Sequence, residues 1–408
     1  MTAREYPVFT VTPKAERSLR AGHPWVYGEE VTAVEGAYQN GDMVDVVSNK
    51  GRYLGTGWVN DHSKIRVRII SRNANDTFDE AFFRRRVCYA LNYRKTVMGP
   101  VDYRCCRLIF GEADQFPGLT VDRFENILVT QVLSLGMERR KDWVYRALVE
   151  LLREDGEQID AIYERNDVAI RTLEGLEQRK GFYQMEGLKT DLCGHVTITE
   201  NRIKYDVDYM EGQKTGFFLD QKYNRQAAAK LARGRRVLDC FTHTGAFALN
   251  AAAAGAEHVT AVDVSAFALE LAAENGKRNG LTNLDYKCAD VFDLLTEMAK
   301  EKKCDYDYII LDPPAFTKSR ATAKNAYHGY KEINRKAMRL LPRGGYLATC
   351  SCSHFMTDEM FRKMLQEAAL DAGVTLRQIE ARQQAPDHPI LPEVPETDYL
   401  KFYLLQVV

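Results

Sequence analysis

The sequence of 408 residues lacks the features of membrane and secreted proteins. No apolar run approaches the roughly 20 residues of a transmembrane helix, and the first segment, MTAREYPVFT, lacks the apolar stretch of a signal peptide. Nine cysteines are scattered without metal-binding spacing: Cys105 and Cys106 are adjacent, and one residue separates Cys350 from Cys352. An odd cysteine count without a secretory signal is typical of the reducing cytosol. We therefore expect a cytoplasmic protein with no membrane partner, no disulfide framework and no metal site.

The chain also has little net charge, −1 at pH 7, and so no overall attraction to nucleic acid. Basic residues nevertheless cluster within residues 14–20, 64–72 and 84–95. Because an average hides local patches, a positive face that binds a polyanion stays open. The run Arg84–Arg86 is by default a solvated helix face, and contact with RNA is the alternative.

The length predicts two or three domains. Residues 1–75 contain short strand-like runs separated by turn signals, which predicts a small β-barrel or sandwich. Residues 76–190 begin with a basic amphipathic helix and continue with antiparallel strands, a helix and a further strand, as in an α+β domain. In residues 191–408 a hairpin precedes helices that alternate with apolar strands. This order predicts a doubly wound parallel sheet of the α/β class.

The most informative segment is 235–263, RRVLDCFTHTGAFALNAAAAGAEHVTAVD. It predicts one βαβ unit with Asp239 and Asp263 at the tips of its two parallel strands and a loop that closes at Gly245. An acid at the second tip is suited to bind ribose hydroxyls. The loop is not GxGxxG, because residues 242–244 are Thr, His and Thr. It therefore favours a nucleoside without a pyrophosphate, such as S-adenosylmethionine (SAM), over a dinucleotide.

Later strands end in residues that suit the same ligand edge. Asp290 follows a strand and is placed to accept from an adenine amine. The buried strand 308–311 stops at Asp312, whose two following prolines form a rigid turn, and Phe316 is available to stack on a base. The strand near 346–351 leads into Cys350 and Cys352. Period-2 alternation would place both thiols on one face, so either one remains a candidate nucleophile.

These motifs resemble a known family. LDCFTHTGAF, AVDVS, LDPPAF and CSCSHF, in that order, look like a class I SAM-dependent methyltransferase with a Rossmann-like fold. EGQKTGFFLDQKYNR at 211–225 and RQQAPDHP at 382–389 resemble the RlmI-type ribosomal RNA methyltransferases. AGHPWVY and GWVN near the N-terminus resemble the PUA RNA-binding module of that family. The resemblance implies a PUA-like domain (1–75), a central α+β domain (76–190) and a methyltransferase domain (191–408).

The family resemblance implies SAM-dependent methylation of cytidine C5 in 23S ribosomal RNA, free or within a large-subunit precursor. Because C5 is a poor nucleophile, such enzymes add a thiolate to C6 first. The frame Cys-Ser-x-x-Met-x-x-Glu matches the family motif best at Cys352, with Cys350 as the alternative. Asp312 is expected to protonate or hydrogen-bond N3 of the base. No cysteine follows the prolines at 313–314, so the base that releases the product is unassigned.

The resemblance implies three sets of site residues. The catalytic residues are Cys352 and Asp312. The cofactor-binding residues are Phe218, Asp220, Arg225, Asp239, Gly245, Asp263 and Asp290, with Thr215 and Gly216 near the methionine end. The substrate-binding residues are Pro313, Pro314, Phe316 and His388.

Three alternatives remain open. The same fold also supports base-nitrogen methylation, for example of guanosine, which needs no thiolate. A non-catalytic SAM-binding ribosome assembly factor would leave the cysteine and DPPAF without a role. If the protein were a small-molecule methyltransferase, the N-terminal module would have no role. The frequency of two-fold dimers among soluble enzymes alone suggests a homodimer.

Overall fold

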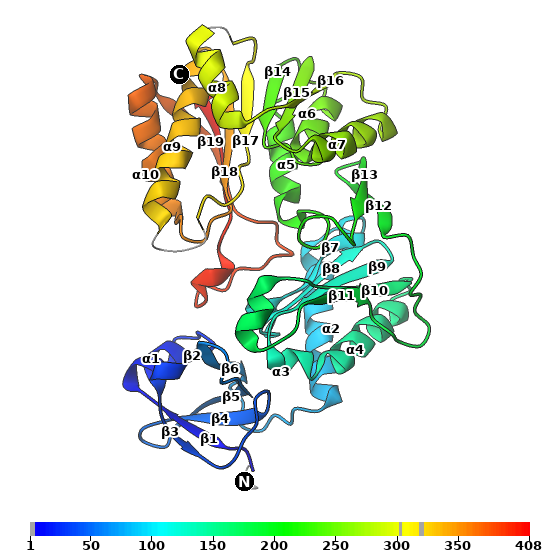
Figure 1. The fold of residues 1–408 in the computed structure, drawn as a ribbon, viewed down its shortest axis with the longest axis vertical. Helices are drawn as coiled ribbons and strands as arrows, with labels where there is room; N and C mark the ends of the chain where they lie inside the picture. The colour runs from blue at the N-terminus through cyan, green and yellow to red at the C-terminus, as the bar shows by residue number, and fades with distance from the viewer. Residues whose placement is uncertain (1–4, 302–303, 318–321) are drawn as a thin grey trace. The chain divides into compact units, whose positions relative to one another are not determined.

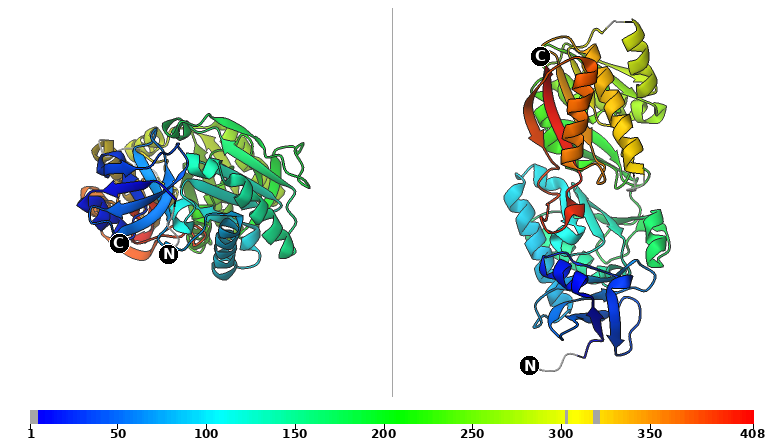
Figure 2. Two further views of the ribbon diagram at one scale, coloured as in Figure 1. Left: turned by 90° about the horizontal axis from the view of Figure 1, so that it is seen from below. Right: turned by 90° about the vertical axis from the view of Figure 1, so that its left-hand side faces the viewer.

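The computed structural model describes residues 5–301, 304–317 and 322–408 (Figures 1 and 2). Contacts divide the chain into two compact units. The N-terminal unit comprises Met1–Ile198, Val207–Leu219 and Pro386–Thr397, and the C-terminal unit comprises Thr199–Asp206, Asp220–Ala385 and Asp398–Val408. Within the described ranges, no helix is both long enough and apolar enough to span a membrane.

The first sheet of the N-terminal unit has six strands in the order β2-β6-β5-β4-β1-β3. The strands are β1 (Val8–Val11), β2 (Trp25–Tyr27), β3 (Val31–Glu35), β4 (Met43–Ser48), β5 (Tyr53–Val59) and β6 (Ile65–Ser71). Helix α1 (Pro13–Arg20) begins after Thr12, whose hydroxyl accepts from the Ala15 N–H. The sequence predicted β1, β4, β5 and β6. It missed the short β2 and the mostly exposed β3, which have no apolar alternation.

The second sheet of this unit has the order β11-β10-β9-β8-β7, with only β9 and β10 parallel. Its strands and helices are α2 (Glu80–Val97), β7 (Cys105–Phe110), β8 (Leu119–Phe124), β9 (Ile127–Val132), α3 (Leu135–Glu138), α4 (Lys141–Glu154), β10 (Ala161–Asn166) and β11 (Arg179–Phe182). The segment Pro386–Thr397 is anchored to this sheet, because the Asp387 carboxylate accepts from the Arg107 N–H at 2.8 Å. The three-domain division inferred from the sequence stays a prediction.

A hairpin of β12 (His195–Glu200) and β13 (Ile203–Asp208) precedes the C-terminal sheet. Its turn residues Asn201 and Arg202 both have positive φ, 52° and 68°, as a two-residue hairpin turn requires. The sequence predicted this hairpin around Asn201.

The C-terminal sheet has seven strands in the order β16-β15-β14-β17-β18-β20-β19. The strands are β14 (Arg236–Cys240), β15 (His258–Asp263), β16 (Leu284–Cys288), β17 (Tyr308–Leu311), β18 (Tyr346–Ser351), β19 (Leu376–Arg382) and β20 (Lys401–Val407). The helices are α5 (Lys222–Ala229), α6 (Ala246–Ala253), α7 (Ala266–Arg278), α8 (Val291–Glu301), α9 (Ala323–Leu340) and α10 (Asp358–Ala372). The predicted doubly wound sheet is confirmed for β14–β18. At one end the sheet departs from this parallel arrangement, because β20 lies antiparallel between β18 and β19.

Alternate residues of the parallel strands face two apolar cores. Leu238 and Ile309 pack in the core formed with α8, α9 and α10, whereas Val237 and Ile310 pack in the core formed with α5 and α6. Figures 1 and 2 show these helix groups on opposite faces of the sheet. Strands buried on both faces read as continuous apolar runs, as they do here.

Strand order reverses between β14 and β17, so this is the topological switch point of the sheet. Ligands of open α/β sheets bind beyond the carboxyl ends of the strands at that point. The parallel register brings the carboxyl ends of β14, β15, β17 and β18 to one edge.

Replacing Ile309 by alanine tests the core of this sheet. Ile309 is fully buried in β17, so Ile309→Ala is expected to lower the free energy of unfolding by about 2–5 kcal/mol. Ile379→Ala, in β19 and 41% exposed, is the matched control and should change it by less than about 0.5 kcal/mol. Urea unfolding is followed by circular dichroism, because all three tryptophans lie in the other unit. Equal shifts for both variants would contradict the core assignment.

Candidate active site

The loop between β14 and α6 has an unusual backbone. Phe241, His243 and Gly245 all have positive φ, at 63°, 51° and 83°. Such conformations are costly for residues other than glycine and concentrate at functional sites. A Cβ on Gly245 would lie 2.9 Å from the Cβ of Ala272 in α7, so this glycine also permits helix packing. The sequence had suggested only a close approach of the ligand to the backbone.

Asp239 is completely buried at the carboxyl end of β14. Its Oδ2 accepts from the Thr242 hydroxyl at 2.6 Å and the Ala248 N–H at 2.9 Å. Its Oδ1 is buried and has no hydrogen-bond partner among the described residues. Burial raises the pKa of Asp239 to about 7, although the hydrogen bond from Thr242 lowers it in part. A buried acceptor without a partner is costly, and a cationic ligand with N–H donors would satisfy it.

The next two acids along this edge each hold backbone N–H groups. The Asp263 carboxylate accepts from the N–H groups of His243 and Ser265, both at 2.9 Å, and so orders the strained loop. The Asp290 carboxylate accepts from the N–H of Phe292 at 2.8 Å and caps the first turn of α8. Both acids stand after neighbouring parallel strands, as the sequence predicted.

Asp312 follows β17 and belongs to a polar network with β18. Its carboxylate accepts from the Gln221 side-chain amide at 3.0 Å and also interacts with the Cys350 thiol. Burial and the negative charge of Asp220 raise the pKa of Asp312 to about 6. A carboxyl group in this range exchanges a proton readily near neutral pH.

The two candidate cysteines have different surroundings. Cys350 is fully buried within β18, and burial together with Asp312 raises the pKa of its thiol well above the usual value. Cys352 is partly exposed. Because β18 ends at Ser351, Cys352 lies beyond the strand, and the expected period-2 alternation does not extend to it.

Lys401 is a buried lysine at the start of β20, beside the segment that contains Cys352. Its side chain is 4% exposed, and its ammonium donates to the carbonyl oxygens of Ser353 at 2.7 Å and Tyr399 at 2.8 Å. Burial lowers the pKa of Lys401 to about 8, and the charges of Asp398 and Cys352 oppose that shift. Both of these partners of the Lys401 ammonium are backbone oxygens, and no carboxylate forms an ion pair with it in the part of the chain described here. A buried ammonium near Cys352 is therefore available to stabilise a thiolate.

The segment before α5 is held by buried polar pairs. The Asp220 carboxylate accepts from the Tyr399 hydroxyl at 2.6 Å. Arg225 makes a two-pronged ion pair with Glu200, at 2.7 and 2.9 Å, and both side chains are buried. Arg225 therefore anchors β12 to α5, and the sequence gave no sign of its partner.

Thr215, Gly216 and Phe218, which were predicted near the cofactor, belong to the N-terminal unit. The Thr215 hydroxyl donates to Asp122 at 2.5 Å, and the Lys214 ammonium lies 4.5 Å from the centre of the Phe218 ring. The structure assigns none of them a ligand, so their roles stay predictions.

The four residues predicted to bind the substrate have different surroundings. Pro313 is buried and Pro314 is exposed beside Asp312. The Phe316 ring lies 4.5 Å from that of Tyr330 in the apolar core of α9. His388 is 2% exposed in the N-terminal unit, where its Nδ1 lies 2.9 Å from Asp387. The structure thus gives His388 a packed setting, and its contact with substrate remains a prediction.

Family profiles and relatives identify the family of this chain. A profile described as a PUA-like domain matches residues 9–72, and one described as S-adenosylmethionine-dependent methyltransferase matches residues 177–405. A protein from Pseudoalteromonas atlantica named ribosomal RNA large subunit methyltransferase I is 40% identical, with 98% of this chain and 99% of that protein covered. The protein of the same name from Aeromonas salmonicida is 42% identical, with 95% and 96% covered. The chain belongs to this family of SAM-dependent methyltransferases.

Solved structures show the same fold. A Streptococcus mutans structure assigned to the SAM-dependent methyltransferases has a TM-score of 0.81 at 22% identity, covering 98% of this chain and all of that one. A methyltransferase structure complexed with SAH has a TM-score of 0.82, also at 22% identity with the same coverage. The predicted fold class, enzyme class and cofactor are confirmed. The residues that fit SAM in this methyltransferase are Asp239, with its unpartnered oxygen, and the neighbouring acids Asp263 and Asp290.

Cofactor binding is expected to depend on pH through Asp239. Below pH 7 this carboxyl is largely neutral, and a neutral acid attracts the cationic sulfonium of SAM less well. Between pH 6 and pH 8, affinity for SAM should rise about tenfold more in the wild type than in Asp239→Asn. Isothermal titration calorimetry measures both profiles. Asp285→Asn, which alters a mostly exposed carboxylate, should keep the wild-type slope; parallel slopes for Asp239→Asn and wild type would refute the assignment.

The buried ammonium of Lys401 is expected to activate Cys352. Lys401→Met removes the positive charge, so alkylation of Cys352 by iodoacetamide at pH 7.5 should slow by about threefold or more. Peptide mass spectrometry follows the Cys352 peptide. Lys363→Met removes an exposed charge from α10 and should leave the rate unchanged. An unchanged rate in Lys401→Met would show that its ammonium does not influence the thiol.

Proposed function

We propose that this methyltransferase transfers a methyl group from SAM to C5 of a cytidine in large-subunit ribosomal RNA, with Cys352 as nucleophile. The names of relatives covering nearly the whole chain support ribosomal RNA as the substrate. The PUA-like match at residues 9–72 supports an RNA partner. The observation that carries the chemistry is the partly exposed Cys352, just beyond β18, with the buried ammonium of Lys401 near it.

The contrast between the two cysteines favours Cys352. A nucleophile must present a thiolate to a base that arrives from outside the fold. Cys350 is enclosed in the sheet beside a carboxyl group, which disfavours its thiolate. Cys352 is reachable, and the nearby charge is positive.

The reaction proceeds in two stages on the base. The Cys352 thiolate forms a bond to C6, and the electron pair of the C5–C6 double bond makes C5 nucleophilic. SAM supplies an electrophilic methyl group when bound. After C5 gains the methyl group, loss of the C5 proton restores the double bond and expels the thiolate. Each step conserves charge and atoms without a metal or a redox partner.

Asp312 is suited to assist the first stage. Addition at C6 places negative charge on the ring, and a proton or hydrogen bond at N3 stabilises it. Because the pKa of Asp312 is raised to about 6, part of its population can donate a proton near neutral pH. The amide of Gln221 orients this carboxyl by holding one of its oxygens.

The test uses 23S ribosomal RNA from cells that lack this protein, with labelled SAM, followed by nucleoside mass spectrometry. The label is expected in 5-methylcytidine, and Cys352→Ala should reduce it at least about a hundredfold because no adduct can form. Cys193→Ala, which changes an exposed cysteine of the N-terminal unit, is the control and should retain activity. Label in a methylguanosine, unaffected by Cys352→Ala, would instead support base-nitrogen methylation.

RNA carrying 5-fluorocytidine tests the adduct itself. Fluorine replaces the proton that must leave C5, so the Cys352–C6 bond should persist after methyl transfer. A denaturation-resistant protein–RNA complex is expected with wild type and not with Cys352→Ala. The same assay on free 23S RNA and on large-subunit precursors identifies the preferred form, and light scattering tests the expected homodimer.

A further inference from the structure

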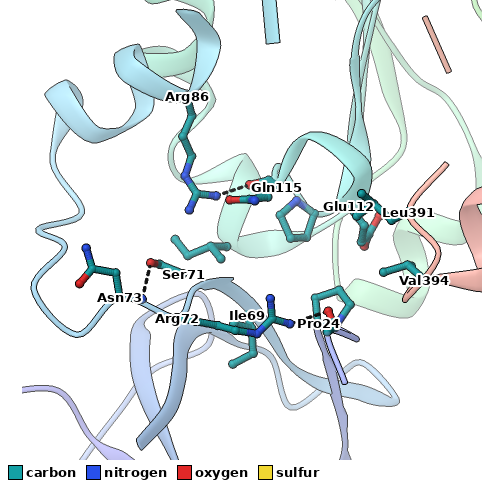
Figure 3. Close-up of a pocket in the computed structure, with 13 residues that line it drawn as sticks. Pro24, Ile69, Ser71, Arg72, Asn73, Arg86, Glu112, Gln115, Leu391 and Val394 are labelled. Atoms are coloured by element: carbon teal, nitrogen blue, oxygen red, sulfur yellow. Dashed lines mark hydrogen bonds between the residues drawn. The ribbon is translucent and has the colours of Figure 1, made fainter. Parts of the chain in front are cut away.

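A cavity of about 270 Å³ lies in the N-terminal unit, and none of the residues that line it is assigned above to methyl transfer. Four parts of that unit line it: the loop between α1 and β2, the end of β6 with the residues after it, helix α2 with the loop that follows β7, and the segment Pro386–Thr397. Figure 3 shows Arg86 reaching toward this space from α2 and Arg72 lying along its opposite side. Pro24, Ile69, Leu391 and Val394 contribute apolar walls.

The basic run in α2 is not uniform. Arg84 is paired with Glu150 at 2.6 Å and Glu154 at 2.7 Å, and Arg85 lies 3.7 Å from Asp76. Arg86 forms no ion pair within the described ranges and donates one hydrogen bond, at 3.0 Å, to the carbonyl oxygen of Gln115. Its guanidinium stacks 4.4 Å from the Phe82 ring, and burial lowers its pKa to about 10.

Arg72 has the same character on the other side of the cavity. Its Nη2 donates to the carbonyl oxygens of Gly22 and His23, and no carboxylate pairs with it among the described residues. Burial lowers the pKa of Arg72, and Glu393 acts on it only over a longer distance. Both arginines are thus held by backbone oxygens and keep N–H donors that no described residue uses.

The acidic side chain in the cavity does not neutralise them. Glu112 accepts from the Trp25 indole N–H at 3.0 Å and lies 3.6 Å from Arg68. Arg68 also pairs with Glu174, at 2.8 Å, so it offsets the charge of Glu112 only in part. The two arginines still outnumber the one acidic side chain that lines the cavity. Desolvated guanidinium groups with free donors are suited to bind phosphate.

We propose that this cavity binds a phosphodiester group of the RNA substrate, through Arg72 and Arg86, with the adjoining nucleotide against the apolar walls. Single-stranded RNA presents unstacked nucleotides to such combinations of guanidinium and apolar surface. The site would anchor the RNA without joining in the reaction. This inference rests on the proposed function, because it takes RNA to be the substrate.

Salt-dependent binding tests it. Binding of a fluorescent single-stranded fragment of 23S RNA is measured by anisotropy from 50 to 300 mM KCl. Each phosphate contact adds about 0.7 to the slope of log K against log[salt] for single strands. The variant Arg72→Met/Arg86→Met should therefore bind several-fold more weakly at 100 mM KCl and lose about 0.7 of slope. Arg84→Met removes one charge from α2 that is already paired with Glu150 and Glu154, and should retain the wild-type slope.

Two further measurements make the result decisive. Arg72→Lys/Arg86→Lys keeps the charge and should restore most of the slope, which a loss of folding would not explain. In methylation assays the methionine pair should raise KM for RNA and leave kcat near the wild-type value. Loss of affinity equal to that of Arg84→Met would overturn the proposal.

Competition identifies the source of the phosphate. Inorganic phosphate at equal ionic strength should displace RNA only weakly, since one free anion lacks the nucleotide contacts. Full displacement by millimolar phosphate, with no RNA-dependent slope at Arg72 and Arg86, would make this a free-anion site and overturn the RNA assignment. If RNA binds as expected and wild type methylates no RNA, the proposed function fails while the binding site stands.

Discussion

The burial of the seven-stranded sheet on both faces is the constraint on which the C-terminal unit depends. Side chains such as Ile309 and Ile310 point into two separate apolar cores, so a charged side chain in the middle of these central strands would be costly. Polar residues are therefore displaced to the carboxyl ends of the strands. The parallel register then gathers Asp239, Asp312 and the cysteine region at one edge. The charged residues of the site therefore gather at the strand ends, because the middle of the sheet is apolar.

Burial also sets the protonation behaviour of this edge. Burial raises the pKa of the carboxyl groups of Asp239 and Asp312. Burial lowers the pKa of the Lys401 ammonium. An acid and an ammonium that both titrate near neutrality can respond to an arriving cation, base or thiolate. Exposed residues of the same types would stay fully charged and respond less.

In the N-terminal unit, buried charged side chains are held by partners from distant parts of the chain. Its buried arginines are held by carboxylates or backbone oxygens from distant parts of the chain: Arg94 pairs with Asp114 and donates to the carbonyl oxygen of Asp387 at 2.9 Å. Such pairs fix the segment after residue 385 against β7. Among the residues that the structure describes, no carboxylate forms an ion pair with Arg72 or Arg86, which backbone oxygens hold instead.

Local patterns were sufficient for much of the fold. Continuous apolar runs that end in acids placed β14, β15 and β17 and the ligand edge, because a short run with a polar tip has few other solutions. Short strands such as β2 and β11 were missed, since their pairing depends on neighbours far away in sequence. The antiparallel β20 was missed for the same reason, because an apolar run does not specify its direction.

The sequence by itself determined the class of sheet, the ligand loop and the set of candidate acids and thiols, because these depend on residue type and short spacing. The family motif favoured Cys352, but only the tertiary structure showed that Cys350 is buried and Cys352 partly exposed, since burial is a property of the packed sheet. It alone paired Arg225 with Glu200 and brought Lys401 near Cys352. These relations join residues 25 to about 50 positions apart, and no local pattern records which distant side chain will be the neighbour.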